Sequence, residues 1–230
     1  MANTLTIYLM VITTLIINYV CVWASSDTTT AGKIDLSELT FERIAVMPFL
    51  IGKLESPDKP VEKPLSQPLP QLLADNYNVK EKSGQVMTRL VDETLRARFR
   101  DKVVPAETVT EAFLDISSDH TIDTPRKLAM KLGDVIGADL VVVGTLWRFR
   151  EKGTDAQPPE GSASIAFAVF LVDVPTGKRL WRGAFDGTQK ALTEDVVGGL
   201  KAIKMGIRWL SADELARYGV KQVFRKFPLH

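Results

Sequence analysis

GADLVVVGTLWRFRE (137–151), SIAFAVFLVDV (164–174) and KRLWRGAFDG (178–187) are the runs that decide the fold, because they predict three consecutive β-strands. In the middle run the side chains that would point to each of the two faces are apolar, which is typical of a strand buried on both sides. One face would hold Ile165, Phe167, Val169 and Leu171, and the other Ala166, Ala168, Phe170 and Val172. The last run alternates, with Trp181, Gly183 and Phe185 inward and Arg182 and Asp186 outward.

Helices and one further strand are predicted around these runs. RIAVMPFL (43–50) reads as the first strand, with Pro48 near its end. Helices are expected at 83–99 after a Ser83 cap, at 106–116, and at 125–136 between a Thr124 cap and Gly137. A short strand is expected at 102–105, and residues 53–78, with five prolines, read as a long loop with extended bias.

The C-terminal part is predicted to be helical, with one helix capped by Thr193. A second helix begins at a capping box made by Ser211 and Glu214, and we expect it to end at Gly219. The whole indicates an α/β fold: a three-layer sandwich whose mixed, mostly antiparallel sheet has the earlier helices on one face and the C-terminal helices on the other. One domain would span 43–230, with the helical extension at 190–228.

The N-terminal segment, residues 5–24, has no charged side chain and is long enough to span a bilayer as a helix. Three interpretations fit it: a secretory signal cut after Ala24, a lipoprotein signal acylated at Cys21, or an uncleaved anchor. Residues 1–24 are thus signal or anchor, and 25–42 form a polar lead-in. Each interpretation directs the chain to a membrane during its synthesis.

Composition and motifs indicate no catalytic group. The net charge of +1 gives no field that would favour nucleic acid. Cys21 is the one cysteine, and neither His120 nor His230 has a metal-binding residue at ligand spacing, so we expect no metal and no cofactor. No phosphate-binding glycine motif occurs. Asp173 and Asp186 flank a hairpin, where an aspartate more often caps backbone amides than acts as a catalytic pair.

Two spaced motifs carry a resemblance to a known family. They are Gly137-Ala138-Asp139 with Gly144, and Asp173 with Thr176-Gly177 and Leu180-Trp181. Over residues 43–188 the chain resembles the curli-secretion-lipoprotein (CsgG-like) superfamily, which is related to LpoB-type activators of penicillin-binding proteins and to TolB N-terminal domains. The resemblance implies a protein of the periplasm or outer membrane that binds other proteins and is not an enzyme. It also allows homo-oligomers.

The chain departs from this family in two ways. The loops lack the amphipathic hairpins of a transmembrane barrel, so we do not expect a channel. The lead-in at 25–42 reaches roughly 60 Å at most, which is short for an activator that must cross the cell wall.

Two charged regions are the candidate interaction surfaces. The proline-rich loop offers Lys53, Lys59 and Lys63, and the C-terminal region offers Trp209, Tyr218, Lys221, Arg225 and Lys226. The ordinary alternative for the second region is a solvated helix face whose apolar residues point inward. We therefore predict a non-catalytic accessory module for an envelope protein complex of secretion, transport or wall synthesis. The alternatives are a membrane-surface structural protein, held by the N-terminal segment and the basic tail, and a carboxylate-dependent hydrolase.

Overall fold

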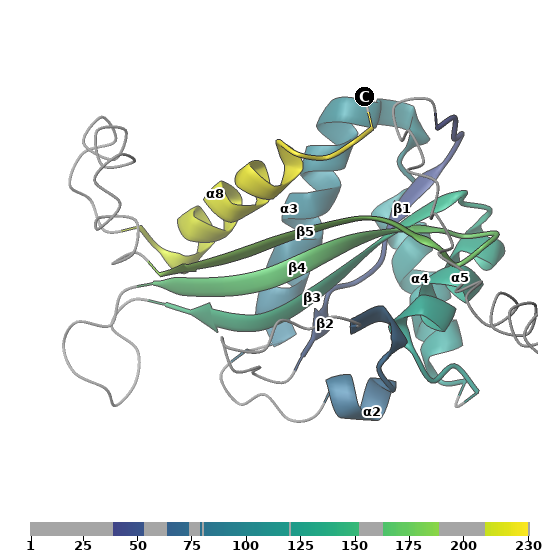
Figure 1. Cartoon of the computed structure of the whole chain (residues 1–230), viewed down its shortest axis with the longest axis horizontal. Coiled ribbons are helices and arrows are strands. Elements are labelled where there is room, and N and C mark those ends of the chain that lie inside the picture. The colour runs from purple at the N-terminus through teal and green to yellow at the C-terminus, as the bar shows by residue number, and fades with distance from the viewer. Residues whose placement is uncertain are drawn as a thin grey trace, which may run out of the picture. The chain divides into compact units, whose positions relative to one another are not determined.

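The computed structural model describes residues 39–52, 64–73, 79, 81–119, 121–151, 163–188 and 210–229 (Figure 1). The predictions for the N-terminal segment, the lead-in and the helix after Thr193 lie outside these residues. Among the described residues, no helix is long and apolar enough to cross a membrane.

A mixed sheet forms the centre of the fold, in the order β1-β3-β4-β5, with the short β2 also paired to β3. The strands are β1 (Ile44–Val46), β2 (Leu50–Ile51), β3 (Leu140–Arg150), β4 (Ser164–Asp173) and β5 (Arg179–Thr188). β1 and β2 run parallel to β3, and the long pairs β3–β4 and β4–β5 are antiparallel. The predicted α/β class and the mixed, mostly antiparallel sheet are confirmed.

The described helices pack on both faces of this sheet (Figure 1). They are α2 (Leu69–Leu72), α3 (Glu81–Phe99), α4 (Ala106–Ser117), α5 (Pro125–Ile136) and α8 (Ala212–Phe224), with short 3-10 turns at η2 (Pro64–Ser66) and η3 (Arg100–Lys102). Ile165, Phe167, Val169 and Leu171 of β4 face α3 and α8, whereas Ala168, Phe170 and Val172 face α4 and α5. The predicted alternation of β4 is therefore correct.

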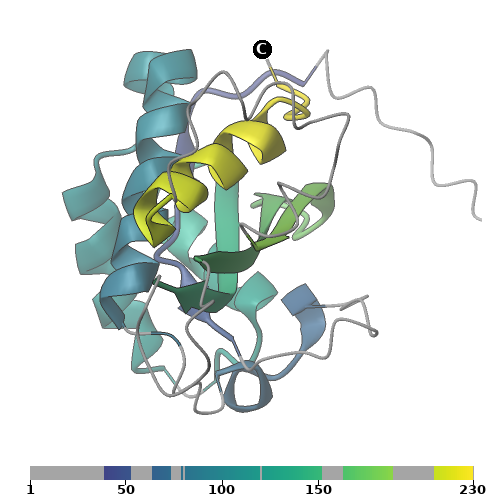
Figure 2. The ribbon, with the colours of Figure 1, turned by 90° about the vertical axis from the view of Figure 1, so that its left-hand side faces the viewer.

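The predicted distribution of helices between the faces is wrong. α3 lies beside the C-terminal helix α8, and the two cover the same face (Figure 2). Residues of α4 and α5 form the core on the opposite face. Amphipathic periodicity indicates which stripe of a helix is buried, but the stripe of α3 fits either face of a sheet that is apolar on both.

Pro48 divides the predicted first strand into two. β1 ends at Val46 and β2 begins at Leu50, and both pair with β3. Proline has no N–H to contribute to a ladder, so the residues around Pro48 leave the strand. The freed N–H of Phe49 donates to Thr88 Oγ1 of α3 at 2.9 Å.

The start of α3 and the segment that follows it differ from prediction. α3 begins at Glu81, so Ser83 lies inside the helix and is not its cap. The segment expected as a strand at 102–105 meets β1 only at an isolated bridge between Val103 and Ile44. Arg96 holds this segment beside α3 by donating to the carbonyls of Val103 and Val104, and it also pairs with Asp92 at 2.6 Å.

The loop prediction for residues 53–78 is wrong where the structure describes them, at 64–73. Leu65 of η2 is only 2% exposed and packs against the α4 and α5 face. The N–H of Leu69 at the start of α2 donates to the carbonyl of Asp123 at 2.6 Å. Apolar contacts and a long-range hydrogen bond therefore bind this part of the segment to the core.

Candidate interaction surface

The aspartates of the two motifs that carry the family resemblance accept hydrogen bonds from backbone N–H groups. Asp139 Oδ2 accepts from the N–H groups of Glu42 and Arg43 at 2.8 and 3.0 Å, which fixes the entry to β1 beside β3. Asp173 accepts from the N–H of Thr176 at 3.2 Å and from its hydroxyl, closing the turn between β4 and β5. Both carboxylates hold the fold together.

The motif glycines serve backbone geometry as well. Gly137 takes φ 64° at the end of α5, and Gly177 takes φ 63° in the β4–β5 turn; both are conformations that suit glycine. Gly144 gives room to the ring of Phe49, since a Cβ there would lie 2.2 Å from its Cε2 atom. The residues that support the resemblance thus have structural roles in the fold. The search for an interaction site therefore turns to the exposed side chains.

Asp173 and Asp186 each have a partner of their own, Thr176 for Asp173 and Arg148 for Asp186. Asp186 forms an ion pair with Arg148 across Ala166 of β4, because all three residues stand in one row of the sheet. Among the described residues, no group of three or more histidine, cysteine, aspartate or glutamate side chains could hold a metal ion.

The described candidate residues lie in α8 and in the two residues that follow it, and hydrogen bonds from two sides hold the first turn of α8. The predicted capping box is present: Ser211 Oγ accepts from Glu214 N, and Glu214 accepts from Ser211 N at 2.9 Å. Glu151, directly after β3, accepts from Ala212 N at 3.1 Å with both carboxylate oxygens. Carboxylates at a helix N-terminus also offset its positive dipole end.

The prediction that α8 ends at Gly219 is wrong, since the helix continues to Phe224. Gly219 lies on the buried face, where a Cβ would be 2.7 Å from Phe185 Cδ1 and 3.0 Å from Phe167 Cε1. This glycine lets the helix approach β4 and β5 closely, and a helix interior tolerates it at a cost of about 1 kcal/mol.

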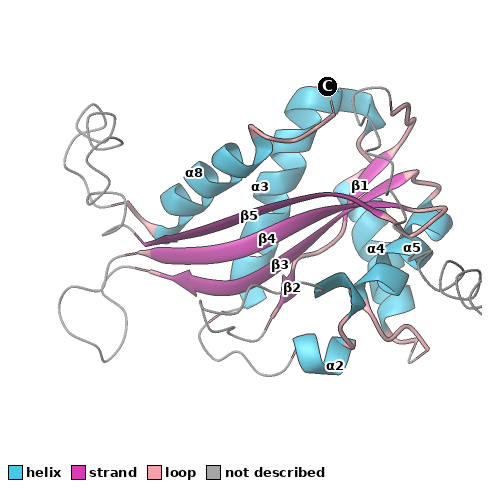
Figure 3. Cartoon of the chain, in the orientation of Figure 1, coloured by secondary structure: helices cyan, strands magenta, loops and turns pink. Residues whose placement is uncertain are grey.

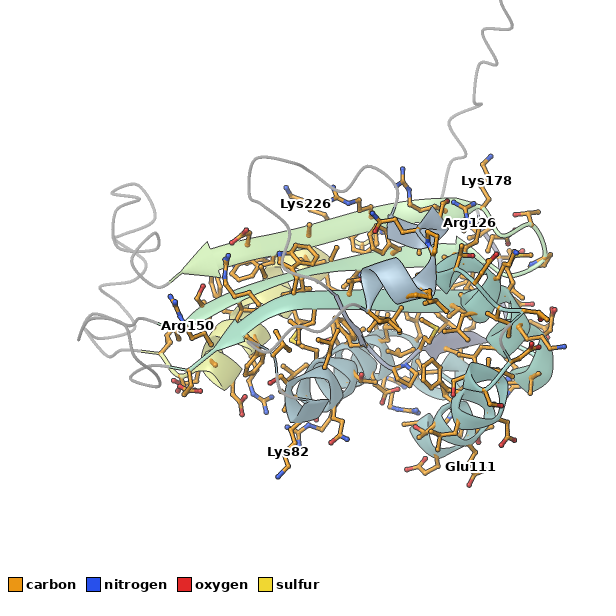
Figure 4. All side chains as sticks on the ribbon, turned by 90° about the horizontal axis from the view of Figure 1, so that it is seen from below. Lys82, Glu111, Arg126, Arg150, Lys178 and Lys226 are labelled. Carbon is orange, nitrogen blue, oxygen red and sulfur yellow. The ribbon has the colours of Figure 1, made fainter. Side chains whose placement is uncertain are left out.

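The structure places the candidate cations in and after α8 at the surface, whereas the nearby aromatic side chains are half-buried or buried. Lys221, Arg225 and Lys226 are exposed, and Figure 4 shows Lys226 pointing away from the sheet. Tyr218 is half-buried, with its ring edge-on to Phe185 at 6.1 Å. Phe224 and Phe227 are 5% and 3% exposed, so they belong to the core and leave the surface to the cations.

A second set of cations reaches the same end of the molecule from α3. Arg98 lies over the rings of Phe99 and Phe227, at 5.7 and 5.8 Å from their centres. Lys102 lies 4.8 Å from the ring centre of Phe41. Such cation–π contacts stabilise each position by about 0.5–1 kcal/mol at exposed sites. The sequence analysis missed these cations, because they join the surface through tertiary contacts such as that between the rings of Phe99 and Phe227.

We call this surface the basic end and define it as Arg98, Arg100, Lys102, Lys221, Arg225 and Lys226, all of which are exposed. Residues 98–102 and 221–226 contain these six basic residues and one acidic residue, Asp101. Arg98 and Lys102 lie over rings that belong to one chain of aromatic contacts, Phe41 with Phe99, Phe99 with Phe227, and Phe227 with the half-buried Trp181. The basic end is thus a charged surface on a packed aromatic support.

The remaining candidates lie outside the described residues. They are Cys21, Lys53, Lys59, Lys63 and Trp209, together with His120 and His230. Their proposed roles stay predictions.

Comparisons with known proteins give distant structural similarities. No protein-family model matches the chain, and no curated protein sequence matches it. A PelC dodecamer from Paraburkholderia phytofirmans is similar at 15% identity and TM-score 0.43, over 82% of this chain and 89% of that one. The LpoB C-terminal domain from Salmonella enterica is similar at 13% identity and TM-score 0.39, over 66% and 87% of the two chains.

Lipoprotein GNA1162 from Neisseria meningitidis is similar at 17% identity and TM-score 0.38, over 71% of this chain and 99% of that one. Similarities at this level say nothing about activity or partners. A likeness to the curli-secretion and TolB proteins stays a prediction.

Proposed function

We propose that this protein is a non-catalytic interaction module of the bacterial envelope, and that it docks through its basic end onto a protein partner with an acidic surface. One observation carries the proposal: Arg98, near the end of α3, lies over the ring of Phe227, which follows α8, so exposed cations from two segments far apart in sequence lie at one end of the molecule. A rigid support of this kind holds charged side chains in a fixed pattern, which favours recognition of a complementary surface.

The apolar N-terminal segment and the family resemblance support the envelope location. Both are predictions from the sequence, and lipidation at Cys21 is one way in which the protein would be attached to a membrane. The proline-rich loop, with Lys53, Lys59 and Lys63, is the second proposed contact.

A protein partner fits the basic end better than a lipid surface does. Peripheral membrane binding commonly combines cations with aromatic or apolar side chains that enter the headgroup region. At the basic end Phe224 and Phe227 are buried in the core, where their rings stack at 5.1 Å. Lys221, Arg225 and Lys226 are therefore exposed without the rings of Phe224 and Phe227 beside them at the surface.

The test combines charge reversal with site-specific crosslinking in the native envelope. Variant one carries Lys221→Glu, Arg225→Glu and Lys226→Glu. Its matched control carries Lys82→Glu, Lys131→Glu and Lys178→Glu, which are exposed positions outside the basic end with the same change in net charge. A photo-crosslinking residue at position 222, beside these cations and half-buried, traps what lies against them.

We expect a defined protein adduct from residue 222 in the parent chain and in the control, and its loss in variant one. Added salt should reduce the adduct, because contacts between exposed charges are screened beyond about 10 Å at 0.1 M. Binding of the parent chain to vesicles with anionic lipid, lost in variant one and without any protein adduct, would instead favour the membrane-surface alternative. An unchanged adduct in variant one would refute docking through the basic end.

A further inference from the structure

β5 is the last strand of the sheet in the part of the chain that the structure describes, and its outer edge faces no described strand (Figure 3). It is one of the long strands, with ten residues from Arg179 to Thr188. An unpaired edge presents a row of N–H and C=O groups that can pair with another chain. Natural edges are commonly short, or protected by proline or lysine, and β5 from Arg179 to Thr188 contains neither residue.

The side chains along this edge have a self-complementary order. Arg182, Ala184 and Asp186 are exposed and lie on one face of β5, opposite Phe170, Ala168 and Ala166 of β4. Arg182 makes no ion pair with any described residue. Asp186 pairs with Arg148, but 53% of its side chain stays accessible. An arginine and an aspartate four residues apart flank a small, central alanine.

We propose that two copies of this chain associate by antiparallel pairing of β5 with β5, around a two-fold axis at Ala184. Ala184 then faces Ala184 of the second copy, Arg182 faces the second copy's Asp186, and Asp186 faces the second copy's Arg182. Opposite charges across an antiparallel pair are favourable, and the symmetry provides the pair twice. The two sheets become one continuous sheet.

Neighbouring registers lack this complementarity. Directly opposed side chains of an antiparallel pair lie on the same face of the sheet. A two-fold axis perpendicular to the sheet must therefore place one residue opposite its own copy, and it cannot fall between two neighbouring residues. An axis at Gly183 places Arg182 opposite Ala184, and an axis at Phe185 places Asp186 opposite Ala184. With the axis at Ala184, each large ring on the other face also meets a glycine: Trp181 faces Gly187, and Phe185 faces Gly183.

The length of the regular strand agrees with this centre. The pairing of β4 with β5 shifts between Leu171 and Val172, where β5 passes from Trp181 to Arg179 and Leu180 is the extra residue. Regular pairing therefore runs from Trp181 to Thr188, and Ala184 is one of the two central residues of this span. The irregularity at Leu180 twists the strand away and limits the overlap to this span.

Cysteine crosslinking tests the register on the full chain, kept in mild detergent because of its apolar N-terminal segment. The background variant is Cys21→Ser, which removes the one cysteine. Directly opposed Cα atoms in antiparallel pairs are about 4.5–5.5 Å apart, within disulfide range. Ala184→Cys should therefore give a disulfide-linked dimer under mild oxidation, and Arg182→Cys should not, because it faces position 186. Equal dimer from both variants, or none from Ala184→Cys, would overturn the proposal.

Charge reversal tests the same pairing without crosslinking, by sedimentation. Arg182→Asp places aspartate opposite aspartate twice, and we expect the dissociation constant of the dimer to rise about tenfold. Arg179→Asp makes the same change outside the paired span and should leave the dimer intact. Mixing Arg182→Asp with Asp186→Arg should restore a mixed dimer, because every opposed pair is then complementary.

A parent chain that sediments as a monomer at all concentrations would also overturn the proposal, as would an Arg182→Asp variant that associates like the parent. The readout is self-association alone, so this result and the partner test at the basic end can succeed or fail independently.

Discussion

Replacement of Gly144 by alanine should destabilise the protein, although alanine is ordinarily the better residue in a strand. The added Cβ would lie 2.2 Å from Phe49 Cε2 and 2.3 Å from its Cζ, far inside the 3.4 Å where ordinary contact begins. Phe49 is 7% exposed and also packs against Phe167, so its ring has little room to retreat. Overpacking costs about 1–3 kcal/mol, and loss of the flexible glycine returns about 0.5–1 kcal/mol.

We expect a net loss of about 1–2 kcal/mol in the free energy of unfolding, or about 2–8 °C in Tm for a chain of this size. Urea unfolding followed by tryptophan fluorescence measures it. Gly84→Ala is the matched control, since its Cβ has ordinary space in α3, with the nearest atom at 3.4 Å. That variant should gain up to about 1 kcal/mol from helix propensity.

A double-mutant cycle with Phe49→Leu isolates the contact. The smaller side chain leaves space that the Gly144→Ala methyl can fill, so the double variant should be more stable than the sum of the single losses by about 1 kcal/mol. Gly144→Ala as stable as the parent, or a coupling of zero, would refute the explanation that this motif glycine exists to seat Phe49.

The remaining predictions concern backbone geometry, and each can be measured by the same urea titration. Gly137→Ala should cost about 1–2 kcal/mol because of its left-handed φ, and Gly137→Asn should cost less; equal losses would contradict this. Asp139→Ala should cost about 1–3 kcal/mol, since it leaves two backbone N–H groups without an acceptor, and a stable variant would show that water replaces the carboxylate. Ser211→Ala should cost about 0.5–2 kcal/mol and raise hydrogen exchange in the first turn of α8 only; uniform exchange would argue against a local cap.

Local signals in the sequence predicted much of the fold. The burial of β4 on both faces was predicted from its own residues, because a strand covered on both sides is apolar at nearly every position. Thr124 and Gly137 bound α5 as expected: the Thr124 hydroxyl accepts from Lys127 N, and Gly137 takes the left-handed conformation. In each case the physical cause lies within a few residues of the element.

The errors arose where the cause was distant in sequence. Gly219 read as a helix end, but it is buried against Phe185 and Phe167, which only the tertiary packing brings near it. Residues 64–73 read as loop, but Leu65 fills a place on the α4 and α5 face. The assignment of α3 to a face depended on where α8 packs, which no local pattern records.

The candidate surface was predictable in part for the same reason. Lys221 and Arg225 are exposed while Val223 and Phe224 between them are buried, which is the pattern of the solvated helix face given as the ordinary alternative. Arg98 and Lys102 were missed, because their contribution depends on the contact between Phe99 and Phe227. Charge at a surface can be read from one helix, whereas a surface shared by two helices needs the fold.

The contact between Glu151 and the start of α8 has a consequence for biogenesis. α8 follows every strand in chain order, yet it covers Phe167 and the first residues of its own helix bond to the end of β3. During synthesis or export from the N-terminus, the part of this face that α8 covers therefore stays open until α8 is free, although α3 already packs on the same face. Such an open apolar face binds chaperones and aggregates readily. We expect the nascent chain to stay export-competent until α8 emerges, and a chain ending before α8 to be degraded.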